Sequence, residues 1–228
     1  MKKKILVVAA HPDDEVLGCG GTVARLAKEG NEVFTLILAE GVTSRYDKAN
    51  SSASISQVNK LREQSIKANT ILGVRQGAIF HSSFPDNRFD SVSLLDIVKA
   101  VELVKEKVQP DAIFTHFRLD LNIDHRITYT AVITATRPLP KECVKEIYSF
   151  EVLSSTEYSY PVHFSPQVFI DISKYLPAKL KAISAYALEL KRAPYPRSLR
   201  GLRLNAEYWG MRVGFRYAEA FEVVRLLR

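Results

Sequence analysis

Short apolar runs rich in β-branched residues alternate with amphipathic stretches through residues 5–136, and this alternation leaves few folds open to the chain. The runs that have the length and composition of strands buried in a parallel sheet are 5–9, 33–39, 78–81 and 112–115. The stretches whose apolar residues recur at helical spacing are 15–28, 55–72, 93–108 and 124–136. This order predicts an α/β, Rossmann-like fold with a mostly parallel sheet and helices on both faces.

The C-terminal third departs from that alternation. Strands are expected at 144–153 and 168–172, a helix at 179–191, and a basic, aromatic tail from 194 onward. No Gly/Ser-rich linker or break in composition separates these parts. A chain of 228 residues can bury roughly 70–75% of its unfolded surface, enough for one substantial core. We therefore expect one domain over residues 1–228 with an elaborated C-terminal third.

The chain carries 32 Lys and Arg against 25 Asp and Glu, a formal charge of +7. Such an excess favours an anionic partner, which could be a nucleic acid, a phosphorylated small molecule or an acidic membrane surface. No pattern of a nucleic-acid-binding module is present, so nucleic acid is not expected.

Nothing approaches the ~20 apolar residues that span a bilayer, and the N-terminal apolar run is too short for a signal peptide. The two cysteines cannot form a disulfide framework. A cytoplasmic protein without a membrane span is expected.

A polar cluster, His11-Pro12-Asp13-Asp14-Glu15, directly follows the first predicted strand. In open α/β sheets ligands bind at the carboxyl ends of the strands, where this cluster falls. A helix N-terminus would explain the three acids but not His11. His11 and Asp14, three residues apart at a tight turn, could both reach one metal ion, and zinc accepts imidazole nitrogen and carboxylate oxygen alike.

A second cluster, residues 115–126, follows the fourth predicted strand and opens a helix. A catalytic zinc takes three protein ligands, and the third should come from the end of another strand. His125, in the first turn of the helix, is the better candidate, and His116 competes for the role. A lone histidine is more often an ordinary surface or core residue, but two such clusters at one sheet edge favour a metal site.

These clusters resemble the zinc-dependent N-deacetylases of the PIG-L group (LmbE-like, N-acetylglucosaminyl de-N-acetylase). The first motif is highly specific and the second moderately so, while weaker similarities extend over nearly the whole chain. The stretches that carry the resemblance are His11–Glu15, Asp120–Arg126, Arg62-Glu63, Leu72-Gly73-Val74, Asp86–Asp90 and Tyr217–Phe221.

The resemblance implies a zinc ion held by His11, Asp14 and His125. Asp13 would then be the general base that takes a proton from the attacking water, and Asp124 would orient an imidazole or Asp13. The implied reaction removes an acetyl group from an N-acetylated sugar or sugar conjugate. The resemblance also suggests a homo-oligomer.

One position departs from the family pattern. Many relatives carry a histidine three residues before the last ligand, where this chain has Asn122. An amide can donate a hydrogen bond to an oxyanion but cannot deliver a proton to the leaving amine. Either Asp13 returns its proton to the amine, which we favour, or His116 serves as the acid.

Substrate contacts are expected from Arg88, His116 and Arg118, which lie in or near segments that should border the same sheet edge. Arg88 is equally well explained as a solvated charge in a turn. The basic tail 197–216, with its interleaved aromatic residues, could cap a glycan or nucleotide. Because much of the basic excess lies in this third, it could face a phosphate or carboxylate on the substrate.

Three other functions compete with this interpretation. A Rossmann dehydrogenase is disfavoured because the glycines at 18–21 fall inside the first helix, where they more plausibly let the helix approach the sheet. A zinc amidohydrolase acting on another C–N bond, such as a formamide or a thiol–sugar conjugate, is not separated from a deacetylase by sequence. A non-enzymatic module that binds anionic glycans or nucleic acid would purify without stoichiometric zinc.

Overall fold

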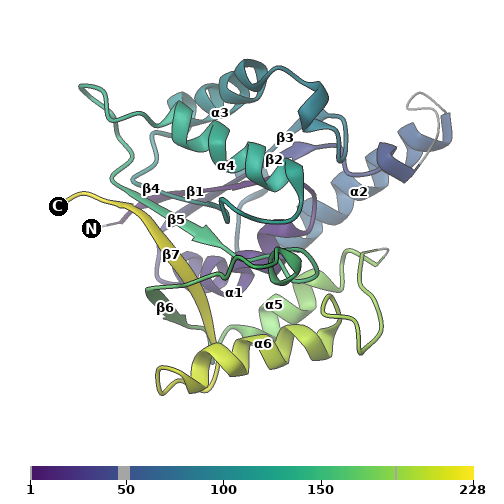
Figure 1. Ribbon diagram of the computed structural model, residues 1–228, viewed down its shortest axis with the longest axis vertical. Coiled ribbons are helices and arrows are strands. Elements are labelled where there is room, and N and C mark those ends of the chain that lie inside the picture. Colours follow the sequence, from purple (N-terminus) through teal and green to yellow (C-terminus); the bar gives the residue numbers. More distant parts are fainter. Residues whose placement is uncertain (1, 46–51, 188) are drawn as a thin grey trace.

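The computed structural model describes residues 2–45, 52–187 and 189–228, and it contains one seven-stranded sheet (Figure 1). The strands are β1 (Lys4–Ala9), β2 (Glu32–Ala39), β3 (Ile79–Phe84), β4 (Ala112–His116), β5 (Glu146–Phe150), β6 (Val168–Asp171) and β7 (Ala218–Leu226). The α-helices are α1 (Asp14–Lys28), α2 (Ser52–Ile71), α3 (Leu94–Val108), α4 (Ile123–Ala135), α5 (Leu176–Ile183) and α6 (Leu199–Met211).

The strand order is β3-β2-β1-β4-β5-β7-β6, and the first five of these strands run parallel. Chain progression reverses between β1 and β4, which are hydrogen-bonded neighbours with Ile5 opposite Ala112. Such a reversal point leaves a crevice at the carboxyl ends of the two strands. The two polar clusters of the sequence follow these two strands, so the topology brings them together.

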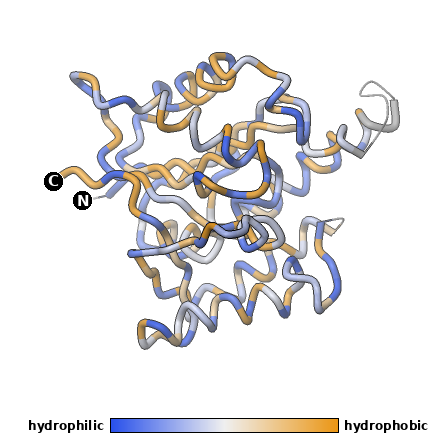
Figure 2. The backbone as a smooth tube through the Cα atoms, in the orientation of Figure 1, coloured by the Kyte–Doolittle hydropathy of each residue, from blue (hydrophilic) through white to orange (hydrophobic). Residues whose placement is uncertain are grey.

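Helices cover both faces of the sheet, as predicted. α3 and α4 pack together on one face, and α1, α2 and α5 lie on the other (Figure 1). A separate apolar cluster fills the space between the sheet and each helical layer, while much of the hydrophobic colour in Figure 2 follows the central strands. The α/β fold class is thus confirmed.

The C-terminal third differs from expectation in two places. The predicted helix over 179–191 is α5, which begins at Leu176, with a proline in its first turn, and ends at Ile183. The chain turns away there, so that Tyr186 is fully buried and its hydroxyl donates to Glu15 Oε1 over 2.5 Å. The tail contains α6 and β7, and β7 pairs antiparallel with both β5 and β6.

Close contact between α1 and the sheet is made possible by its glycines. A Cβ atom on Gly18 would lie 2.2 Å from the ring of Phe150 in β5, and one on Gly21 would lie 2.8 Å from Ile172. Only a residue without a side chain fits at such separations. The predicted role of these glycines is therefore confirmed.

A kink at Cys19 divides α1, and an acid from β7 stabilises it. Cys19 has non-helical backbone angles, and the Glu219 carboxylate accepts the N–H groups of Gly21 and Thr22 over 2.9 and 2.6 Å. Lys179 of α5 pairs with Glu219 at 2.6 Å, and both side chains are buried. The C-terminal third thereby fixes the helix that carries the first polar cluster.

Among the described residues, no helix is long and apolar enough to cross a membrane. The location in the cell and the oligomeric state stay predictions.

Candidate metal centre

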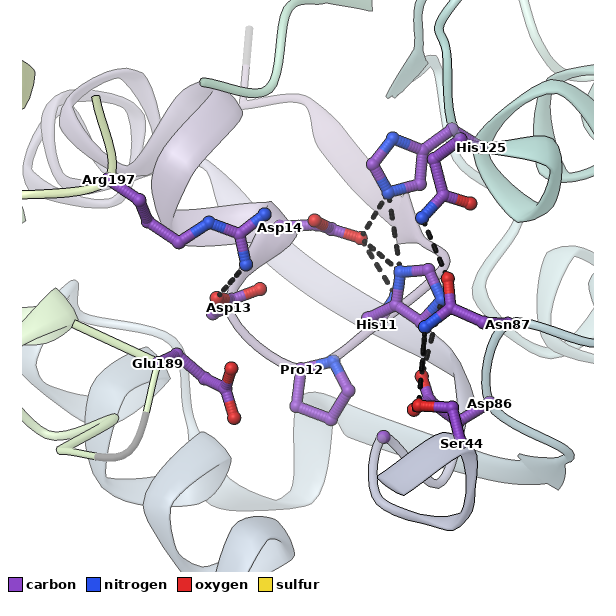
Figure 3. Close-up of a pocket in the computed structure, with 12 residues that line it drawn as sticks. His11, Pro12, Asp13, Asp14, Ser44, Asp86, Asn87, His125, Glu189 and Arg197 are labelled. Carbon is purple, nitrogen blue, oxygen red and sulfur yellow. Dashed lines mark hydrogen bonds and ion pairs between the residues drawn. The ribbon is translucent and has the colours of Figure 1, made fainter. Parts of the chain in front are cut away.

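Three ligand-type atoms meet at the carboxyl ends of β1 and β4 (Figure 3). His11 Nδ1 lies 3.1 Å from Asp14 Oδ2, Asp14 Oδ2 lies 3.2 Å from His125 Nε2, and the two ring nitrogens are 3.3 Å apart. A tetrahedral metal with bonds of about 2.0–2.1 Å holds its ligand atoms about 3.3–3.4 Å apart. The triangle therefore has the size and the nitrogen and oxygen chemistry of a three-ligand zinc site.

The other nitrogen of each imidazole faces a buried carboxylate. His11 Nε2 lies 3.1 Å from Asp124 Oδ2, and His125 Nδ1 lies 3.1 Å from Asp120 Oδ1. Carboxylates in this position fix the tautomer and orientation of metal-binding histidines. Both histidine rings are therefore held with the inner nitrogen pointing at the centre of the triangle.

The two supporting carboxylates are themselves anchored. Asp124 Oδ1 accepts the N–H of Phe89 over 2.9 Å, and the hydroxyls of Ser155 and Thr156 donate to Asp120. Burial alone would raise the pKa of Asp120, but the contact with His125 and the two hydroxyls lower it to about 2. Asp120 is consequently ionised at neutral pH and available to hold His125.

The turn after β1 sets the orientation of the acidic side chains in the first polar cluster, His11–Glu15. Asp13 has a φ of 108°, in the left-handed region that aspartate enters more readily than most residues. The N–H of His11 donates to Asp14 Oδ2 over 2.9 Å, which closes the turn. The N–H groups of Val16 and Leu17 both bond to the Asp13 carbonyl and begin the helix. Asp13 and Asp14 thus present their carboxylates to one cavity, although they are neighbours in sequence.

Arg197, from the segment before α6, contacts Asp13. Arg197 Nη1 lies 3.0 Å from Asp13 Oδ2, and Nε donates to Ser154 Oγ over 3.2 Å. Asp13 is only 1% exposed. Burial raises the pKa of Asp13, and the Arg197 charge works against that rise. The sequence placed Arg197 in a basic tail but offered no spacing signal that would pair it with Asp13.

The cavity in front of the triangle has a volume of about 160 Å³ and a mostly polar wall. Among the residues whose side chains the structure describes, four carboxylates line it, those of Asp13, Asp14, Asp86 and Glu189, together with the guanidinium of Arg197. The basic excess of the chain is therefore not concentrated in this wall. The complete lining is His11, Pro12, Asp13, Asp14, Gly41, Ser44, Asp86, Asn87, Asn122, His125, Glu189 and Arg197.

Asn122 lines the cavity and caps α4 as well. Its Oδ1 accepts the N–H of Asp124 over 2.8 Å, and its Nδ2 donates to Asn87 Oδ1 over 2.9 Å. Asn122 therefore both caps the helix and forms part of the cavity wall. Asn87 was not predicted as a site residue. The sequence feature that could have identified it is its position in the stretch Asp86–Asp90, next to Arg88.

None of the three expected substrate contacts is among the residues that line this cavity, and their role stays a prediction. Arg88 and Arg118 are exposed and do not line the cavity; Asp86 and Asn87 occupy the wall beside Arg88 instead. His116 is fully buried behind the triangle, where its Nε2 accepts the N–H of Ala10 over 2.8 Å and its ring stacks on His125. Burial lowers the pKa of His116, and its lone pair is already used. In this arrangement His116 supports His125 from behind.

Comparison with known proteins identifies similar chains. The sequence profile of the PIG-L family, described as GlcNAc-PI de-N-acetylase, matches residues 6–136. The uncharacterized deacetylase YaiS of Escherichia coli K12 is 29% identical over 191 residues, covering 81% of this chain and 91% of the relative. Diacetylchitobiose deacetylase of Thermococcus kodakarensis is 26% identical over 97% of this chain and 83% of the relative.

Among solved structures, the N,N'-diacetylchitobiose deacetylase of Pyrococcus horikoshii has the same fold. It superimposes with a TM-score of 0.76 at 22% identity, covering 98% of this chain and 84% of that protein.

Proposed function

The chain belongs to the PIG-L family, and from that premise we propose that it is a zinc-dependent deacetylase that removes the acetyl group of an N-acetylated sugar or sugar conjugate. The observation that carries the proposal is the triangle of His11, Asp14 and His125 beside the buried carboxylate of Asp13. The diacetylchitobiose deacetylases among its relatives support the substrate class.

Zinc is the proposed metal because two imidazoles and one carboxylate, with a free fourth direction toward the cavity, form a donor set typical of catalytic zinc. When bound, the metal polarises the amide carbonyl and lowers the pKa of a bound water toward about 7. The arrangement of His11, Asp14 and His125 requires no movement of the backbone to reach zinc-like separations.

Asp13 is the proposed general base. Its carboxylate lines the cavity, next to Asp14 in the chain, and is held by Arg197. It accepts a proton from the water that attacks the amide carbon and returns that proton to the amine as the C–N bond breaks. Acetate and the free amino sugar are the products. Returning the proton through Asp13 removes the need for a separate acid, which Asn122 cannot supply.

Asn122 and Asn87 supply amide groups to the same wall. The Asn122 Nδ2 donor, which bonds to Asn87 Oδ1, can turn to the developing negative charge on the carbonyl oxygen. Asp86 and Glu189 add carboxylates suited to sugar hydroxyls. A wall of this kind favours a neutral sugar over one that carries a phosphate at the reacting end.

Acetate release from N-acetylhexosamines, free and nucleotide-linked, tests the function directly on zinc-loaded protein. We expect Asp13→Ala to retain zinc and lose nearly all turnover, and His125→Ala to lose zinc as well. Wild-type rates in Asp13→Ala would show that the assigned base is wrong. Release of formate or another acid from non-acetylated amides, without acetate release from any sugar, would support the alternative amidohydrolase.

A further inference from the structure

Glu15, the last acid of the first polar cluster, neither belongs to the metal triangle nor lines the cavity. It follows the proposed ligand Asp14 directly in the chain, and it is only 1% exposed. Burying a carboxylate is costly unless other groups of the protein bond to it. The partners of Glu15 therefore indicate what this side chain does.

Three hydrogen-bond donors converge on the Glu15 carboxylate. The Tyr186 hydroxyl and Asn69 Nδ2 both donate to Oε1, over 2.5 and 2.9 Å. The backbone N–H of Asp13 donates to Oε2 over 3.0 Å. Tyr186 and Asn69 are fully buried. Because both oxygens of Glu15 act as acceptors, a glutamine in its place would turn an NH2 group toward at least one donor.

The bond from the Asp13 N–H stabilises the turn that presents the proposed general base. Asp13 has a φ of 108°, a conformation that an L residue keeps only when its surroundings hold it there. Glu15 Oε2 holds the backbone of Asp13, and Arg197 holds its carboxylate. The general base is therefore fixed at two points, one on each side of the turn.

The neighbouring ligand, Asp14, has anchors that do not involve Glu15. Asp14 Oδ2 accepts the backbone N–H of His11 over 2.9 Å and lies 3.1 Å from His11 Nδ1. These contacts remain when the Glu15 side chain is altered. A change at Glu15 should therefore disturb Asp13 more than it disturbs the metal triangle.

The segment between α5 and α6 contacts the general base by two routes (Figure 1). Arg197 bonds to the Asp13 carboxylate directly (Figure 3), whereas Tyr186 reaches the Asp13 backbone through Glu15. The N–H of Lys191 donates to the Arg197 carbonyl over 3.0 Å, which folds this segment back on itself. One segment of the C-terminal third therefore helps to orient Asp13 from both sides.

We propose that Glu15 and Tyr186 are positioning residues for the hydrolysis. The Tyr186 hydroxyl, together with Asn69, fixes the Glu15 carboxylate, and Glu15 fixes the Asp13 backbone so that its carboxylate faces the attacking water. Neither Glu15 nor Tyr186 lines the cavity, so both act through Asp13 and not on the substrate. This inference rests on the proposed deacetylase function, in which Asp13 is the general base.

The test measures kcat, KM and zinc content for Tyr186→Phe and Glu15→Gln, with the N-acetylated sugar from which the wild type releases acetate fastest. Tyr186→Phe removes one hydroxyl and keeps the buried ring. Tyr148→Phe is the matched control, because the Tyr148 hydroxyl bonds to another glutamate, Glu146 of β5, over 3.1 Å. Rates are divided by bound zinc, so that unfolded or metal-free protein does not affect them.

We expect kcat per bound zinc to fall about tenfold in Tyr186→Phe and about a hundredfold in Glu15→Gln, because small misplacements of a catalytic group have effects of this size. KM and zinc content should remain close to those of the wild type, and Tyr148→Phe should match it in every respect. A residue that only stabilised the fold would change the amount of zinc-loaded protein but not its rate. An unchanged kcat per bound zinc in Tyr186→Phe overturns the proposal, even if Glu15→Gln does not fold.

The double variant Tyr186→Phe/Arg197→Gln tests whether Tyr186 acts through Asp13. Groups that orient the same base work as a unit, so the loss of the second should add little once the first is gone. We expect kcat of the double variant to lie within about threefold of that of Arg197→Gln alone. A loss equal to the product of the two single losses would overturn the route through Asp13.

Failure of the proposed function gives a different result. If no sugar releases acetate from the wild type, the deacetylase proposal fails, and solvent exchange of the Asp13 amide proton then decides the positioning role. Nuclear magnetic resonance of protein labelled with 15N-aspartate follows this proton. Exchange that is faster by about tenfold or more in Tyr186→Phe and Glu15→Gln supports the hold on the turn. Equal exchange in the variants and the wild type overturns it.

Discussion

Asp13 Oδ2 lies 3.0 Å from Arg197 Nη1, an ion pair that joins the turn after β1 to a segment 184 residues later. The same guanidinium bonds to Ser154 in the loop after β5. Three parts of the chain therefore meet at the proposed general base. Because Asp13 is buried, the orientation of its carboxylate depends on its ion pair with Arg197.

Replacing Arg197 by glutamine should lower kcat about tenfold to hundredfold, since small misplacements of a catalytic group have effects of that size. Zinc content should not change, because Arg197 contacts none of the three ligands. Arg197→Lys should restore part of the rate by supplying a charge without the second bond to Ser154. The matched control is Arg75→Gln, which breaks an exposed pair with Glu32 and should remain within twofold of the wild type. Equal rates in Arg197→Gln and the wild type would refute this positioning role.

Asp120→Asn should weaken zinc binding about tenfold to hundredfold, because an amide holds His125 less firmly than a carboxylate does. Competition between the protein and a chelator of known affinity measures the change. Asp96→Asn, on the exposed surface of α3, is the control and should bind zinc like the wild type. Unchanged affinity in Asp120→Asn would mean that His125 is oriented by other contacts.

Lys179→Met should lower the free energy of unfolding by about 3–5 kcal/mol, because it removes the only charged partner described for the buried Glu219 carboxylate and leaves it the N–H groups of Gly21 and Thr22. Urea denaturation measures this loss. The matched control, Lys181→Met, changes an exposed lysine of the same helix and should alter stability by less than about 0.5 kcal/mol. If both variants unfold at the same urea concentration as the wild type, the buried pair contributes little to the stability of the protein.

The sequence predicts features that depend on local patterns better than features that depend on contacts between residues far apart in the chain. The parallel strands and their helices follow from local apolar patterns, and the meeting of His11 with His125 follows from the rule that ligands gather at strand ends. No comparable rule predicts where the chain turns back on itself in the C-terminal third. α6 and β7 were not predicted because β7 is stabilised by pairing with the distant strands β5 and β6, and α6 by packing against β7. Arg197 was not paired with Asp13 because no local pattern encodes a contact across 184 residues. His116 lies at the end of a strand, as predicted. Its side chain points inward and bonds to Ala10, because the ring packs against Phe150 and His125.

Stability should depend on pH through His81, which lies away from the metal centre and bonds to Ser65 Oγ over 3.0 Å. Burial, with the nearby charge of Arg62, lowers the pKa of His81 to about 4, against about 6.5 in the unfolded chain. Above pH 6.5 the residue is neutral in both states, so its contribution is fully present. As the pH falls from 6.5 toward 4, His81 becomes protonated in the unfolded chain but stays neutral in the folded one, so the free energy of unfolding decreases.

Because His81 is partly exposed, we expect this loss to be about 1–2 kcal/mol, less than the full shift would give. His81→Gln keeps a side chain able to bond to Ser65 but cannot titrate. The free energy of unfolding, measured by urea at pH 7.5 and 4.5, should therefore fall less in the variant than in the wild type. Parallel pH profiles for the two proteins would show that His81 accepts a proton in the folded state as easily as in the unfolded one.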